Sequence, residues 1–585
     1  MRVAVVGGGV SGLGAVWALN EHSDHEVHLF EPGEWIGGHT NTQDFVHPRS
    51  SGNESTPVDT GFIVFNEVTY PNLLRFFKLV GVEILDSEMS FSVSRYGKTP
   101  RPNAQHHATG VEAERGMFEW AGTSPAALFC QPRNLFNPAH WRMVWDIIRF
   151  NQQSVDYLRQ NQHHVGQEIS IGEWLKQRGY SDAFVRNYLI PVTASIWSTA
   201  PSTALSSFPA ITLLRFMHNH HLLQLVNRPQ WLTCKGGSRN YVERIISKLP
   251  DERIHRGKAG EIVSARRQEN GWVLCDANRS EAPGRFDKVI FACHADTSVA
   301  ILDEALPSDS EVRKTLERFH FSENVAVLHA DKRLLPVRRQ AWSAWNFVTE
   351  TVSAAEAGQQ ANGGADNGSD DVDVVCLTYN MNILQHIPTS KFGDVLVTLN
   401  PAERDSSPYK PDPSLVLRTQ KYTHPLYTPD TVQAQKELKP LQGRNGLFFA
   451  GAWTNYGFHE DGFSSGLRAA EAIEGVQLPF DVRAAERKLP ASKGLNVVAV
   501  DVLDAAGRLS PVRWAAQATL AVLLYLFALE AFVSSLLLRF GLVDGKKLNG
   551  WKKEVLAVRS FLEDAQARPA GRVRSREGYS KAKLQ

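Results

Sequence analysis

Six residues near the N-terminus, Gly7-Gly8-Gly9-Val10-Ser11-Gly12, have the types and spacing of a phosphate-binding turn. They follow the β-branched run Arg2–Val6 and precede a helical pattern, LGAVWALNE. In a G-x-G-x-x-G turn the first glycine permits the tight bend, the second lets the backbone approach a diphosphate, and the third lets strand and helix pack closely. The helix N-terminus then faces the phosphates. We therefore predict dinucleotide binding; the alternative is a tight turn in any α/β protein.

An acidic residue stands where such a site needs one. A second apolar strand is expected over Glu26–Phe30 and ends at Glu31, about 20 residues after the glycines, where a carboxylate can accept a ribose hydroxyl. A 2′-phosphate is disfavoured there, because two negative groups would face each other. The predicted ligand is therefore FAD or NAD.

The residues after Glu31, PGEWIGGHTNT, decide between these two ligands. The spacing from Glu31 to Gly37-Gly38 and on to Thr42 resembles the second fingerprint of the flavin-containing amine oxidase superfamily. The resemblance implies FAD as cofactor, with the double glycine beside its diphosphate and ribityl chain. Where this superfamily usually has two arginines, the chain has Trp35 and His39. Backbone dipoles or a cation from elsewhere must then balance the phosphate charge.

The resemblance extends to about residue 475 and implies an α/β fold. A discontinuous Rossmann-like FAD-binding domain is expected from residues 1–85, 230–305 and 440–475. An α+β substrate domain is expected from residues 86–229 and 306–439. Residues 353–371 lack large apolar side chains and are predicted to form a solvated insertion. A tail follows over 476–585.

A closing motif, FAGAWTNYGFHEDGFSSGLRAA, covers residues 449–470. By resemblance, its strand ends beneath the flavin and its small residues, from Gly462 to Gly466, begin a helix whose N-terminus faces the flavin ring. Ala452 stands where most relatives have Asp or Glu, so either a main-chain amide suffices or Glu460 or Asp461 substitutes. The residues of this motif expected to contact FAD are Gly451, Ala452, Gly462 and Phe463.

One catalytic residue is predicted, His459, because the resemblance carries it toward the flavin and an unperturbed imidazole titrates near neutrality. The alternative is a histidine that packs a loop. Trp453, Tyr456 and Phe458 are candidates for an aromatic cage around an amine. The cluster His218, His220 and His221 lacks acidic partners and lies in a helical pattern, so no metal site is predicted.

The predicted function is that of an FAD-dependent oxidoreductase that moves a hydride from a C–N or C–C site of a small-molecule substrate, a lipid or an amine, onto the flavin. An FAD-dependent desaturase or isomerase of fatty-acyl chains is the alternative. A flavin-binding partner protein without turnover is the alternative from another class.

Charge and composition bear on partners and location. The net charge of +1 gives no basis for a nucleic-acid partner. Five scattered cysteines indicate a reduced protein that faces the cytosol. The apolar segment Ala515–Leu538 has about the length that a bilayer requires. We therefore expect a membrane-associated protein whose C-terminal helix spans the membrane or lies in its plane, with the FAD domain in the cytosol.

Overall fold

The computed structural model describes residues 1–49, 54–96, 117–161, 169–197, 209–224, 228–269, 271–282, 284–353, 371–405 and 407–506. Residues 1–491 form one compact unit, and the second unit begins at Ser492. In the second unit the structure describes helix α19 (Leu495–Ala506). All that follows concerns the first unit.

A five-stranded parallel sheet is built from three distant segments of the chain. Its order is β10-β2-β1-β13-β19, with β1 (Arg2–Val6) at the centre. The sheet also contains β2 (Glu26–Glu31), β10 (Ile254–Arg256), β13 (Lys288–Phe291) and β19 (Leu447–Phe449). Val3, Ala4 and Val5 are fully buried, as expected for a parallel strand covered on both faces. The predicted Rossmann-like α/β architecture is confirmed.

Two helices from opposite ends of the first unit cover this sheet side by side. Helix α1 (Val10–His22) follows β1, and α18 (His459–Glu471) follows β19. Residues after α18 continue along the same unit, since Phe480 stacks on Trp17 with ring centroids 6.0 Å apart. The other helices near this sheet are α2 (Pro71–Val80), α11 (Arg239–Ile246), α12 (Ala295–Ile301), α13 (Glu311–Leu316) and α17 (Pro429–Leu438).

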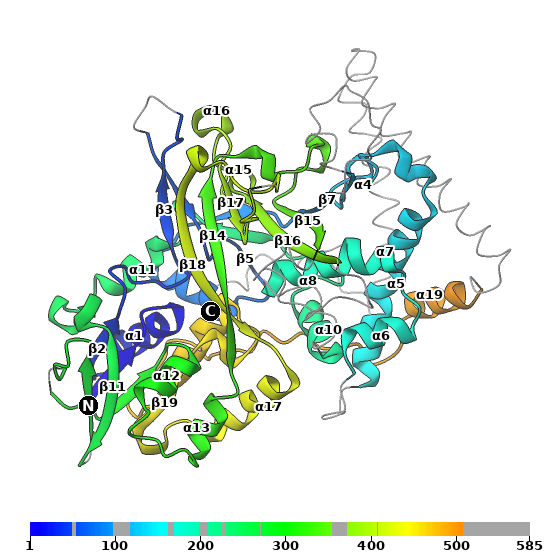
Figure 1. Cartoon of the computed structure of the whole chain (residues 1–585). Coiled ribbons are helices and arrows are strands. Elements are labelled where there is room, and N and C mark those ends of the chain that lie inside the picture. The colour runs from blue at the N-terminus through cyan, green and yellow to red at the C-terminus, as the bar shows by residue number, and fades with distance from the viewer. Residues whose placement is uncertain are drawn as a thin grey trace, which may run out of the picture. The chain divides into compact units, whose positions relative to one another are not determined.

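A seven-stranded mixed sheet forms the other half of the unit, in the order β18-β14-β17-β16-β15-β7-β8. Its strands are β7 (Phe91–Tyr96), β8 (Phe118–Ala121), β14 (His320–His329), β15 (Trp345–Ser353), β16 (Asp371–Asn380), β17 (Leu396–Leu399) and β18 (Val416–Leu426). Figure 1 shows a group of helices gathered beside β15 and β16, and these share one apolar core with the sheet. They are α5 (Pro138–Gln160), α6 (Ile171–Gln177), α7 (Asp182–Phe184), α8 (Ile190–Trp197) and α10 (Ala210–Asn219).

Smaller elements join the two halves. One two-stranded sheet pairs β3 (Thr42–Phe45) with β4 (Thr56–Asp59), and another pairs β11 (Ile262–Gln268) with β12 (Gly271–Asp276). A three-stranded sheet has the order β5-β9-β6, from β5 (Phe65–Asn66), β9 (Trp231–Cys234) and β6 (Ile84–Ser87). Short helices α4 (Pro125–Leu128), α15 (Met381–Leu384) and α16 (Thr389–Phe392) complete the described unit.

The predicted insertion falls between strands β15 and β16 in the sequence. Strands β15 and β16 pair antiparallel from Trp345 opposite Tyr379 to Ser353 opposite Asp371. The residues between, 354–370, lie outside the described part of the chain.

The predicted membrane localisation, with an FAD domain facing the cytosol, is wrong. Within the described ranges, no helix combines the length and the apolarity needed to cross a bilayer. Helix α5 has 23 residues, but buried Asp146 on it accepts hydrogen bonds from Arg142, Arg149 and the Ser181 amide, so polar pairs inside the protein stabilise it. The predicted hydrophobic helix over 515–538 lies outside the described residues.

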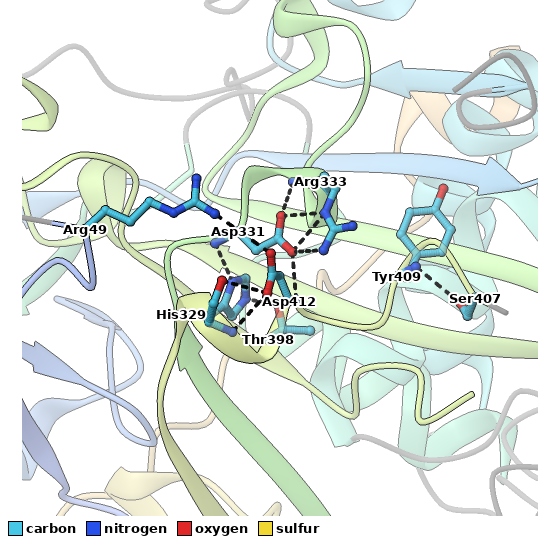
Figure 2. A network of polar contacts seen from close by, with 9 residues as sticks. Arg49, His329, Asp331, Arg333, Thr398, Ser407, Tyr409 and Asp412 are labelled. Carbon is cyan, nitrogen blue, oxygen red and sulfur yellow. Dashed lines mark hydrogen bonds and ion pairs between the residues drawn. The ribbon is translucent and has the colours of Figure 1, made fainter. Parts of the chain in front are cut away.

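A polar network centred on buried His329 and Asp331 lies where strand β14 ends (Figure 2). The Asp331 amide donates to His329 Nδ1 at 3.0 Å, so the proton of the neutral imidazole is on Nε2, which donates to Thr398 Oγ1 at 2.7 Å. The Asp331 carboxylate accepts from the Arg333 side chain and from the Asp412 amide. This network holds the end of β14 to β17 and to the loop before β18.

We predict that His329 makes the protein sensitive to acid. Burial lowers the pKa of His329 to about 4, whereas the unfolded chain titrates near 6.5. The unfolded state therefore binds more protons between these values, and stability falls as the pH drops below about 6.5. Through His329 alone, the free energy of unfolding should be about 2 kcal/mol smaller at pH 5.0 than at pH 7.5.

Urea unfolding at both pH values measures this difference. His329→Gln should reduce it and should also lower stability at pH 7.5, because hydrogen bonds are lost. The matched control is His320→Gln, at an exposed position in the same strand. A variant His329→Gln with the full wild-type pH difference would contradict the prediction.

Candidate active site

A cavity of about 480 Å³ lies where the carboxyl ends of the parallel strands meet the seven-stranded sheet. Ligands bind at this edge in open α/β sheets. Predicted site residues contribute one part of its wall, namely Gly7, Gly9, Val10, Ser11, Glu31, Gly38, His39, Gly451, Ala452 and His459. Apolar and aromatic residues contribute another part, including Met89, Phe216, Leu222, Trp231, Trp345, Tyr379 and Leu399.

Each of the three glycines of the N-terminal turn is glycine for a different structural reason. Gly7 has φ +110°, and a Cβ there would lie 2.7 Å from the Ala292 carbonyl oxygen. A Cβ on Gly12 would lie 1.8 Å from the Gly7 carbonyl oxygen, so Gly12 is required for the contact between α1 and the turn. At Gly9 a Cβ would meet no atom within 4 Å. Gly9 therefore leaves open space, in the cavity, at the N-terminus of α1.

Glu31 is the last residue of strand β2 and lies beside this turn. Its carboxylate accepts hydrogen bonds from the amides of Gly8 at 2.7 Å and Gly33 at 2.8 Å. Burial raises the pKa of Glu31, and these two hydrogen bonds oppose that shift. The carboxylate is thereby fixed in the wall of the cavity, where a ribose hydroxyl would be recognised.

The second glycine pair packs directly on the first motif. Gly9 and Gly37 form a parallel bridge, and a Cβ on Gly38 would lie 3.1 Å from the Gly9 Cα. Gly38 and His39 reach the cavity wall. Thr42 is not among the described residues that line the cavity, because its hydroxyl donates to Asp59 at 2.6 Å.

The closing motif divides into cavity residues and packing residues. Gly451 and Ala452 line the cavity, and the Gly451 amide donates to Ser465 Oγ at 2.9 Å. Gly462 packs against Val10, where a Cβ would lie 2.6 Å from the valine Cγ1. Phe463 lies in the core, with its ring 4.9 Å from that of Phe76. The structure thus does not bring Gly462 and Phe463 to the cavity wall.

Helix α18 begins at His459, three residues before the predicted start at Gly462. The reason is a cap, since the Asp461 carboxylate accepts from the Phe458 amide at 2.9 Å. Glu460 is engaged elsewhere and accepts from the amides of Asn72 and Leu73 at 3.0 Å. Neither acid is among the described residues that line the cavity, so of the two predicted options the main chain at Ala452 is the better placed.

His459 lies in a hydrogen-bonded cluster at the cavity wall. Its Nε2 is 2.6 Å from the Tyr241 hydroxyl and 3.2 Å from Thr40 Oγ1. Its ring stacks on Phe62 with centroids 3.7 Å apart. Burial lowers the pKa of His459 well below its ordinary value. This arrangement suits a neutral histidine that positions the wall, because its Nε2 is already engaged by the Tyr241 and Thr40 hydroxyls and is not free to accept a proton from a substrate.

Of the residues predicted for an aromatic cage, Trp453 and Phe458 line the cavity, but the three side chains are not assembled as one group. The Trp453 indole donates to the Cys293 carbonyl oxygen at 3.1 Å and packs on Phe319. Phe458 instead stacks on Phe216 with ring centroids 4.9 Å apart. Tyr456 is not among the described lining residues.

His220 is a cavity residue that the sequence did not indicate. Its Nδ1 donates to the Phe216 carbonyl oxygen at 3.0 Å, so the lone pair of the neutral ring is on Nε2. Burial lowers the pKa of His220 to about 4. Within the described residues, no group of three metal-binding side chains occurs, at this histidine cluster or elsewhere. The structure therefore offers an uncharged proton acceptor in an aromatic wall.

Comparisons with known proteins match both ends of this site. A family model of an NAD(P)-binding Rossmann-like domain matches residues 5–79, and the model for flavin containing amine oxidoreductases matches residues 415–474. The chain thus resembles the flavin-containing amine oxidase superfamily over these two segments, as predicted. It is an FAD-dependent oxidoreductase, and FAD is its cofactor. A comparison with curated proteins finds no match.

Solved structures share the fold at low sequence identity. Putrescine oxidase bound to putrescine is 14% identical, with a TM-score of 0.50 over 81% of this chain and 99% of that chain. The CLA-producing fatty acid isomerase from P. acnes is 11% identical, with a TM-score of 0.50 over 81% of this chain and 98% of that chain. These likenesses show the fold alone.

We predict that two glycine variants separate folding from cofactor binding. Gly12→Ala should lower the free energy of unfolding by about 3 kcal/mol, because the new Cβ forces the turn and α1 apart. Gly9→Ala should leave the stability of the apoprotein within about 1 kcal/mol of wild type, since Gly9 has φ −72° and open space around it.

The same Gly9→Ala variant should bind FAD at least about tenfold more weakly, because the methyl group occupies the space of the approaching diphosphate. Urea unfolding of the apoproteins and fluorescence titration with FAD measure the two effects. Wild-type FAD affinity in Gly9→Ala would show that the diphosphate does not approach this residue.

Proposed function

We propose that this oxidoreductase removes a hydride from a C–N or C–C site of an uncharged, hydrocarbon-rich substrate. The observation that supports this is the composition of the cavity wall. Among its described residues Glu31 is the single acid, and its carboxylate already accepts two amide hydrogen bonds at the dinucleotide end. A diamine would lose its hydration without gaining a carboxylate partner.

The fold itself does not select a substrate. Proteins whose names refer to putrescine and to a fatty acid share it with this chain at a TM-score of 0.50. The wall favours the apolar class, because Trp345 and Tyr379 pack edge to face at 5.0 Å and lie near aliphatic residues such as Leu399. An alkyl chain or a neutral monoamine with a large apolar group fits such a chamber.

FAD, when bound, supplies the hydride acceptor. Oxidation of a C–N or C–C bond also releases a proton, from nitrogen or from the neighbouring carbon. His220 Nε2 carries a lone pair in the cavity wall and accepts that proton. Isomerisation returns the hydride and releases no net proton, so the free lone pair of His220 favours oxidation or desaturation over isomerisation.

The other wall residues hold the site in shape. Tyr241 and Thr40 fix the His459 ring, and that ring supports Phe62 by stacking. The Phe216 and Phe458 rings flank His220 at 4.0 and 4.9 Å and keep water from it. Exclusion of water protects the reduced cofactor and strengthens the interactions within the chamber.

Anaerobic mixing with three kinds of compound tests the proposal. The methyl ester of a long-chain unsaturated fatty acid, a long-alkyl monoamine and putrescine are added separately to the FAD-loaded protein, and loss of the visible flavin absorbance is followed. We expect at least one of the apolar compounds to reduce the flavin and putrescine to do so at least about a hundredfold more slowly. Faster reduction by putrescine would overturn the substrate class, and no reduction by any compound would favour the non-catalytic flavoprotein.

We predict that His220→Gln slows flavin reduction by about 10²- to 10⁴-fold, the usual contribution of a positioned acid or base. The concentration of substrate that gives half the limiting rate should change little, because a glutamine keeps the polar contact. His221→Asn is the matched control, since His221 bonds Gln224, is not among the described lining residues and has φ +58°, which asparagine tolerates. Equal rates in the two variants would remove His220 from the reaction.

A further inference from the structure

The FAD diphosphate brings two negative charges to a wall without an obvious cation. Neither arginine that the superfamily usually places near the glycine pair is present, because Trp35 and His39 occupy those positions. The Trp35 side chain is 46% exposed. Among the described residues that line the cavity there is no arginine or lysine.

Three histidines from separate segments line the same cavity, and we call them the histidine cluster. His39 follows the glycine pair, His294 precedes α12, and His424 lies in β18. The ring centroids of His39 and His424 are 5.4 Å apart.

The cluster lies beside the phosphate-binding turn. A Cβ on Gly38, the neighbour of His39, would lie 3.1 Å from the Gly9 Cα. A Cβ on Gly7 would lie 2.7 Å from the carbonyl oxygen of Ala292, two residues before His294. Tyr422 stacks on His39 at 4.8 Å and holds the β18 side of the cluster in place.

His39 and His424 are each held through one ring nitrogen, which leaves the other for a ligand, whereas both ring nitrogens of His294 lie 3.4 Å from Thr423 Oγ1. His39 makes a hydrogen bond with the Thr423 backbone, and its Nε2 is buried without a hydrogen-bond partner. The Asn324 amide is 2.8 Å from His424 Nδ1. His294 stacks on Phe321 at 4.2 Å. An unpartnered buried nitrogen is costly unless a ligand completes its bonds.

We propose that the histidine cluster takes the place of the missing arginines and binds the FAD diphosphate, with uptake of a proton by the cluster when FAD binds. The protonated ring supplies N–H donors and a positive charge opposite the phosphates, while the N-terminus of α1 supplies backbone donors from the other side.

The charged and titratable groups around the cluster make this coupling possible. Burial and the neighbouring histidines lower the pKa of His39 to about 3, and burial and His294 lower the pKa of His424 to about 4. Burial also lowers the pKa of His294, opposed by Asp296. The remaining facing groups are Glu31, His459, Cys293 and Tyr422. The cluster is therefore neutral before FAD binds, and the diphosphate must raise its pKa.

The affinity for FAD should depend on pH. Because the complex binds more protons than the apoprotein, FAD affinity rises as the pH falls. With half a proton taken up on average between pH 6 and pH 8, FAD should bind about tenfold more tightly at pH 6 than at pH 8, and a full proton would make the difference about a hundredfold.

Calorimetric titration of the apoprotein with FAD at pH 7, in buffers of different ionisation enthalpy, counts the protons taken up. Fluorescence titration at pH 6 and 8 gives the dissociation constants. Wild type should take up a fraction of a proton, up to one. His39→Gln should bind FAD more weakly and with less proton uptake, whereas His39→Arg should restore tight binding that does not depend on pH.

If His39→Gln folds poorly, His294→Gln serves in its place, and it should also reduce FAD affinity and proton uptake. His255→Gln is the matched control, because His255 stacks on His28 and Phe30 and is not among the described lining residues. No proton uptake by the wild-type protein, together with equal FAD affinity at pH 6 and 8, would overturn the proposal.

Discussion

The contact between α1 and α18 is the constraint on which the rest of the site depends. A Cβ on Gly466 would lie 1.9 Å from the Ser11 carbonyl oxygen, and one on Gly14 would lie 2.9 Å from that of Phe463. The two helices therefore meet backbone to backbone. Since α1 begins at the phosphate-binding turn and α18 begins at the cavity wall, this contact fixes two motifs that are about 450 residues apart in the sequence.

Several buried histidines of the interior are uncharged and hydrogen-bonded. His220 and His459 each have one ring nitrogen hydrogen-bonded to a neighbouring polar group, His329 has both, and burial lowers the pKa of all three. Such rings supply polar atoms at fixed positions without the desolvation cost of a charge. The part of the cavity that faces the substrate therefore carries no fixed charge. The charges that must be balanced lie at the dinucleotide end.

The sequence predicted what depends on neighbouring residues and missed what depends on packing. The turn at Gly7 to Gly12 and the carboxylate of Glu31 belong to one strand-turn-helix-strand unit, so their spacing was sufficient. The small residues from Gly462 to Gly466 were expected at a helix start facing the flavin ring, whereas in the structure Gly462 and Gly466 permit the close approach of α1. His220 could not be recognised, because its position in the wall depends on how α10 and the Phe458 loop pack together.

The paired strands β15 and β16 separate the cavity wall from the positions at which this part of the described chain ends and resumes. Trp345 and Tyr379 face each other at their base, and Ser353 pairs with Asp371 at the far end, eight residues along the strand. At about 3.3 Å per residue, roughly 26 Å separates the two ends. An insertion between Ser353 and Asp371 would therefore join the described strands far from the cavity wall, so this stretch of the sequence is a natural site for an epitope or a fluorescent label.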